Sequence, residues 1–105
     1  MAIPDYQMIM LPLLNYLSDG KEKSSTVTFE ELADLFNLSE AERKELLPNG
    51  QQPIFSNRIA WAKAYLKKAG LIQSSRRGIY KITTIGKKVL KQKPDKIDSD
   101  YFLEE

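Results

Sequence analysis

The chain has 105 residues, contains neither cysteine nor histidine, and carries a formal net charge of +2 at pH 7. This length predicts one small domain, and the missing residue types exclude disulfides, thiol nucleophiles, histidine-based triads and the usual zinc sites. Because no apolar run approaches about 18 residues and no basic leader precedes the apolar N-terminus, we expect a cytoplasmic protein without a membrane span.

The charge is divided unevenly along the chain. Residues 1–45 carry 4 basic and 9 acidic side chains, residues 46–94 carry 11 basic and no acidic ones, and residues 95–105 carry 1 basic and 5 acidic ones. A surface that is only solvated mixes both signs, so the acid-free block indicates a polyanionic partner. Lysine and arginine placed against phosphates release condensed counterions. The block is therefore predicted to bind double-stranded DNA.

The first expected helix covers Ile3 to Leu17 and is interrupted by Pro12. Proline lacks an amide donor and clashes one turn back, so we expect either a kink near Met8 or a new helix start with Pro12 in the first turn. The apolar residues are denser than one core-facing stripe requires. This density fits either a central core helix or a helix that also meets another chain, so a homodimer is one expectation.

A second helix is expected to follow a polar connection. Val27 is predicted to form a very short strand, and Thr28 with Glu31 fits a capping box that starts the helix. Asn37 can end it. The buried face of this helix is predicted to contain Phe29, Leu32, Ala33 and Phe36.

A short third helix is expected between the second helix and the basic block. Ser39 and Glu42 repeat the capping-box pattern, and the helix should run to about Leu47 before Pro48–Gly50 stop it. A minimal helix-turn-helix joins its two helices by a turn of about three or four residues. We therefore interpret this helix as an insertion.

The long helix from Pro53 to Ala69 has two distinct faces. One is an apolar stripe made of Phe55, Ile59, Ala62, Leu66 and Ala69. The opposite face combines small residues, which allow a close approach, with hydrogen-bonding residues and lysines: Ser56, Asn57, Ala60, Lys63, Ala64, Lys67 and Lys68. Such a face suits a DNA groove. Asn57 fits either a contact to a base edge or phosphate, or a solvated polar residue.

A β-hairpin is predicted after Gly70, which can end the long helix. Ser74–Gly78 supply the turn and Ile79–Thr83 the returning strand. Arg76 and Arg77 at the tip suit phosphates, although a solvated loop pair is the alternative. Lys81 on the returning strand joins the candidate DNA-binding residues. A helix followed by such a wing predicts a mainly α fold with a small β-hairpin, a single winged helix-turn-helix domain over residues 1–91.

Three side chains at the margins of the long helix have two interpretations each. Arg58 and Tyr65 lie at the edge of the apolar stripe, so they can pack their stems and offer only their polar ends. Arg58 is kept among the candidate DNA-binding residues. Trp61 lies about 120° from the centre of the stripe, which fits either burial against the inserted helix or stacking on an exposed base or a partner surface.

A last helix is expected from Ile85 to about Lys91, capped by Thr83 or Thr84, with Ile85 and Val89 packed inward. Its outward lysines are weaker candidates for phosphate contacts, because a helix C-terminus favours cations in any case. They are Lys87, Lys88, Lys91 and Lys93. Residues 92–105 are predicted to be an acidic tail or linker.

Three segments give a specific resemblance, namely Leu46–Gly50, Asn57–Ala62 and Tyr65–Leu71 in that order and spacing. Over residues 2 to 91 the chain resembles the N-terminal domain of the Mrr family of restriction endonucleases. The resemblance implies that this domain recognises modified, chiefly methylated, DNA and that a C-terminal nuclease domain of the same protein cuts it.

The nuclease signature of that family is not found in this chain. It needs two acidic residues and a lysine around one metal ion, whereas here only Pro94-Asp95 matches its first pair. Asp95, Asp98 and Asp100 also lack the pattern of a calcium loop. We therefore predict no catalytic residue, metal ligand or cofactor in the chain. A docking or dimerisation module that does not bind DNA is the alternative function.

Overall fold

The structure is a computed structural model that describes residues 3–94 and 97. Its elements in chain order are α1 (Tyr6–Tyr16), β1 (Lys23–Ser24), α2 (Ser25–Leu35), α3 (Glu40–Lys44), α4 (Ile54–Lys68), β2 (Ile72–Arg76), β3 (Ile79–Ile82) and α5 (Thr84–Lys91). The strands form one antiparallel sheet in the order β1-β3-β2. The predicted fold class, mainly α with a small hairpin, is confirmed.

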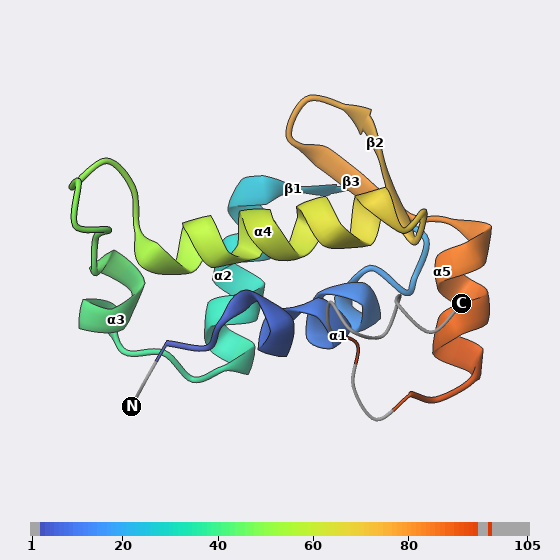
Figure 1. The fold of residues 1–105 in the computed structure, drawn as a ribbon, viewed down its shortest axis with the longest axis horizontal. Helices are drawn as coiled ribbons and strands as arrows, with labels where there is room; N and C mark the ends of the chain where they lie inside the picture. Colours follow the sequence, from blue (N-terminus) through green and yellow to red (C-terminus); the bar gives the residue numbers. More distant parts are fainter. Residues whose placement is uncertain (1–2, 95–96, 98–105) are drawn as a thin grey trace.

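The long helix α4 lies at the centre of the fold (Figure 1). The hairpin of β2 and β3 rises along one side of α4, α1 runs along the other, and α3 and α5 lie near opposite ends (Figure 1). The predicted stripe of α4 is buried at Phe55, Ile59, Ala62 and Leu66. The stripe is therefore the middle of the core, and the opposite face of α4 is left beside the hairpin.

The first helix begins at Tyr6 and continues through Pro12. The Asp5 side chain accepts a hydrogen bond from the Met8 amide at 2.9 Å, which caps the helix start. A new helix start at Pro12 is therefore wrong. The central position in the core is confirmed, because the helix has four buried residues, Ile9, Met10, Leu13 and Leu14.

The second helix starts earlier than predicted. Ser24 is its N-cap, and its side chain accepts from the Val27 amide at 3.2 Å. Thr28 is buried inside the helix and donates its hydroxyl to the Ser24 carbonyl at 2.7 Å. The predicted capping box at Thr28 is therefore wrong, and Val27 is helical. A two-residue strand does pair with the wing, but it is Lys23–Ser24.

The insertion is fastened to its neighbours at both ends. The capping box at Ser39 is confirmed, although α3 ends at Lys44 and not near Leu47. Arg43 donates to Asp34 at 2.8 Å and to Glu30 at 3.3 Å, which ties α3 to the acidic face of α2. At the other end the Ile54 amide donates to the Glu45 carbonyl at 2.8 Å.

Gly70 ends α4 with a φ of 81°, a backbone conformation that favours glycine. The Leu71 amide then donates to the Leu66 carbonyl at 2.9 Å, so the chain turns directly into β2. The hairpin turns at Arg77 and Gly78, between β2 and β3, with a register shift between Ser74 and Arg76. The predicted hairpin is confirmed, with a shorter turn than expected.

In the last helix, the residue that faces the core is not the one predicted. Thr83 is the N-cap, as expected, and Val89 packs against the core. Ile85, however, is 55% exposed, so its predicted inward packing is wrong. The buried residue of α5 is Gly86. Its neighbours are so close that a Cβ there would overlap the carbonyl oxygen of Leu71 and come within 2.6 Å of Ile82 Cγ1.

Gly86→Ala is expected to destabilise the domain. In an open helix this change would gain up to about 1 kcal/mol, whereas forcing a methyl group into a packed contact costs about 1–3 kcal/mol. Urea unfolding of Gly86→Ala beside the exposed-site variant Lys87→Ala would measure the difference. A Gly86→Ala domain as stable as the original would show that α5 can move away from Leu71 freely.

Ile97 lies in the segment predicted to be an acidic tail, yet it is fully buried in the core. Among the described residues the core therefore extends beyond Lys91, where α5 ends as predicted. The expectations for Asp95, Asp98 and Asp100 fall outside the described residues.

Candidate nucleic-acid interface

A groove of about 430 Å³ lies between α4, the start of α2 and β3. It includes five of the seven residues predicted for the outward face of α4. Its lining residues are Ser25, Phe29, Ser56, Ile59, Ala60, Lys63, Ala64, Lys67 and Tyr80. No acidic side chain is among them, so the groove presents cations, hydroxyls and small apolar groups.

Lys63 lies deepest among the cations of this groove. It is 7% exposed, and its ammonium donates to Ser25 Oγ at 3.0 Å and lies 4.5 Å from the ring centroid of Tyr80. This burial lowers the pKa of Lys63 from its ordinary value. A helical wheel places Lys63 on the face of α4 opposite the apolar stripe, but α2 and β3 cover it, so it is buried outside that stripe.

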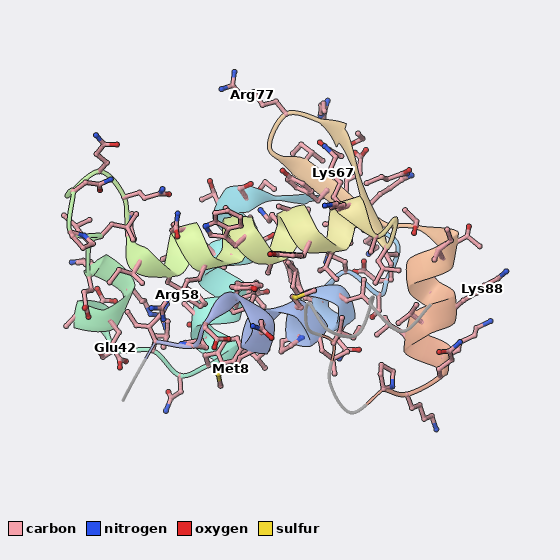
Figure 2. The ribbon with its side chains drawn as sticks, in the orientation of Figure 1. Met8, Glu42, Arg58, Lys67, Arg77 and Lys88 are labelled. Carbon is pink, nitrogen blue, oxygen red and sulfur yellow. The ribbon has the colours of Figure 1, made fainter. Side chains whose placement is uncertain are left out.

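The other α4 candidates are more accessible. Lys67 is exposed and extends from the side of α4 that faces the hairpin (Figure 2). Lys68 is also exposed, whereas Ser56 and Asn57 are half-buried. Lys67 and Ser56 line the groove together with Lys63, so α4 brings three of its predicted DNA-binding side chains to one place.

The wing presents two further cations. Arg76 and Arg77 are both exposed, and Arg77 extends from the hairpin tip into solvent (Figure 2). The Ser25 amide donates to the Gly78 carbonyl at 3.0 Å, which ties the tip to the start of α2. Lys81 is half-buried on β3. The hairpin is therefore fixed beside the groove with its arginines outward.

Arg58 is directed away from the groove, and Asn57 and Lys68 of α4 do not line it either. The Arg58 guanidinium donates to the Ile3 carbonyl at 2.7 Å and to the Pro4 carbonyl at 3.3 Å, on the opposite side of α4 (Figure 2). These bonds hold the N-terminal segment against α4. Arg58 therefore has a structural partner that the sequence pattern alone did not identify.

Trp61 is 53% exposed, so its predicted burial against the inserted helix is wrong. Its ring centroid lies 6.5 Å from that of Tyr65, which stacks on Tyr6 at 5.0 Å with an interplanar angle of 10°. Stacking of Trp61 on a base or a partner surface stays a prediction.

Comparison with known proteins identifies the family of this chain. Residues 6–92 match the family model of the Mrr N-terminal domain. The chain belongs to this family. It is 34% identical over 87 residues to the type IV methyl-directed restriction enzyme EcoKMrr of Escherichia coli K12, and the match covers 82% of this chain and 28% of that enzyme. The Mrr N-terminal domain thus corresponds to less than a third of its relative. No solved structure gives a significant match.

The described part of this Mrr N-terminal domain has no group of three or more histidine, cysteine, aspartate or glutamate residues placed to hold a metal ion. Among the same residues, no helix combines the length and apolar character needed to cross a membrane. The acidic residues Glu30 and Glu40 line a neighbouring hollow beside α3, together with Arg43 and Lys44, and this hollow shares Ser25, Phe29 and Ser56 with the groove.

Proposed function

We propose that this domain binds double-stranded DNA and directs a nuclease domain of a longer, cytoplasmic protein to modified DNA. In this proposal α4 enters a groove of the duplex and the wing contacts phosphates. The observation that carries it is the joint surface of the groove and the wing, where Lys63, Lys67, Arg76 and Arg77 gather in a block of the chain without one carboxylate.

The dimensions and chemistry of α4 support this placement. Its 15 residues span about 22 Å at about 1.5 Å per residue, and the major groove admits such a helix. Ala60 and Ala64 are exposed, so the backbone of α4 can approach base edges closely. Alanine methyl groups also contact the C5-methyl group of pyrimidines in the major groove. Ser56 and Asn57, near the N-terminal end of α4, lie where recognition helices contact bases.

The relative supports the remainder of the proposal. EcoKMrr is described as a methyl-directed restriction enzyme, and the match covers only 28% of it. We infer that hydrolysis of DNA belongs to the part of such a protein outside this domain. Within the domain the described residues offer no metal-binding cluster, and we assign it recognition alone.

Titration of a fluorescent duplex, with and without 5-methylcytosine, tests the proposal. We expect a Kd near the micromolar range and a fall in log affinity of about 0.9 per phosphate contacted for each log unit of salt. Four contacting cations would give a slope of about −3.6. Tighter binding of the methylated duplex would support modification-directed recognition.

Absence of binding to either duplex at low salt would overturn the proposal. A salt-insensitive dimer in sedimentation experiments would then support the docking module. Lys44→Ala is a suitable control, because Lys44 is exposed on α3, pairs with Glu40 at 3.6 Å and is not among the residues that line the groove. This variant should bind DNA like the original domain.

A further inference from the structure

Lys63 differs in its partners from the cations that form ion pairs in the described structure. Lys23, Arg43 and Lys44 each have a carboxylate within 4.0 Å, whereas the described contacts of the buried Lys63 ammonium are a hydroxyl and an aromatic ring. An ammonium group has three N–H donors, and burying its charge without an opposite charge costs free energy. The free domain therefore holds a cation that an anion in the groove would stabilise.

The start of α2 adds a second contribution at the same place. Ser25 is the first residue of this 11-residue helix and lines the groove beside Lys63. The N-terminus of a helix carries a partial positive charge that favours anions. The Ser25 and Val27 amides already donate to Gly78 and Ser24, and the Ser25 hydroxyl donates to the Gly78 carbonyl at 3.4 Å, so the contribution comes from the helix dipole.

We propose that this groove is a phosphate subsite in which one backbone phosphate of DNA becomes the counter-ion of Lys63. The phosphate accepts from the Lys63 ammonium, while Ser56 and Lys67 lie at the same groove and complete the donor set. This inference rests on the proposed function and goes beyond it, because it assigns a defined contact to a buried side chain and not only to the exposed wing.

The subsite couples DNA binding to protonation. A phosphate beside Lys63 opposes the lowering of its pKa by burial, so the complex holds the proton more firmly than the free domain. Affinity should therefore fall as pH rises through the lowered pKa of Lys63, at values below 10.5. The other ionisable groups that line the groove are Lys67 on α4 and Tyr80 on β3, since the α2 residues there do not titrate.

The test compares Lys63→Met with Lys67→Met, which removes an exposed cation from the same helix. Each variant should lose about eightfold in affinity at 0.1 M salt and lower the salt slope by about 1. Only Lys63→Met should also lose the fall in affinity with rising pH. Tyr80→Phe should keep that fall, which separates Lys63 from the tyrosine hydroxyl.

Two results would overturn the subsite while leaving the proposed function intact. One is an original domain that binds duplex and a Lys63→Met variant with the same affinity and salt slope. The other comes from NMR of the Lys63 side chain in the unsubstituted domain, which needs no folded variant. A change in the Lys63 side-chain resonances on adding duplex supports the subsite. If these resonances change with inorganic phosphate and duplex does not reverse that change, the site binds free phosphate and the subsite is overturned. Failure of the unsubstituted domain to bind duplex overturns both proposals.

Discussion

Replacing Arg76 and Arg77 together with alanine is expected to weaken duplex binding about sixtyfold at 0.1 M salt. Each phosphate contact contributes about 0.9 log units of affinity per log unit of salt. Taking the contribution as zero at 1 M salt, two contacts add about 1.8 log units of affinity at 0.1 M, or about sixtyfold. Both arginines are exposed on the wing beside the groove, so their loss should leave the fold intact. The measurement is the salt dependence of duplex affinity for the double variant.

A matched control removes two exposed lysines outside the acid-free block, Lys21→Ala/Lys44→Ala. It changes the net charge of the domain equally, so any effect of overall charge appears in both double variants. The prediction requires a lower salt slope for the wing variant only. Equal losses in both variants would show that net charge, and not the wing, sets the affinity.

The elements that the sequence predicts well are those determined by local patterns. The buried stripe of α4, the glycine turn at Gly70 and the capping box at Ser39 each depend on residues within about one or two helical turns. The hairpin is equally local, because Gly78 and the strands on both sides form it together. These elements were predictable because their patterns are local, and together they place α4 beside the wing.

The errors arise where distant segments meet. Ile85 looks inward on a helical wheel, yet Gly86 takes that position because Leu71 and Ile82 approach the first turn of α5. The helical start at Ser25 depends on β1, which pairs with β3 more than fifty residues later in the sequence. Neither neighbour is visible in the local pattern.

The candidate site shows the same limit. The wheel correctly grouped Ser56, Lys63 and Lys67, but it could not show that α2 and β3 bury Lys63, nor that carbonyls of the N-terminal segment engage Arg58. It also could not show that the inserted helix leaves Trp61 exposed. The acid-free composition was the useful signal for the groove, since charge is counted without knowledge of the fold.

The second large effect is expected at the start of α4, where Phe55 is fully buried. Its ring makes edge contacts with Phe29 of α2 at 5.5 Å and with Phe36, the residue that caps the end of α2, at 6.2 Å. Phe55→Ala should therefore lower the free energy of unfolding by about 3–5 kcal/mol, from the lost transfer energy and the cavity left behind. A domain of this size would lose roughly 12 °C or more in Tm.

Trp61→Ala is the matched comparison, because it truncates an aromatic side chain of the same helix at a half-exposed position. Its effect on Tm should be much smaller, since water already reaches much of the indole and little cavity forms. Thermal unfolding of both variants measures the contrast. Phe55 joins α4 to α2, and the groove lies between those helices, so Phe55→Ala should also weaken duplex binding while still folded. Similar Tm losses for the two variants would contradict the view that Phe55 anchors α4 on α2.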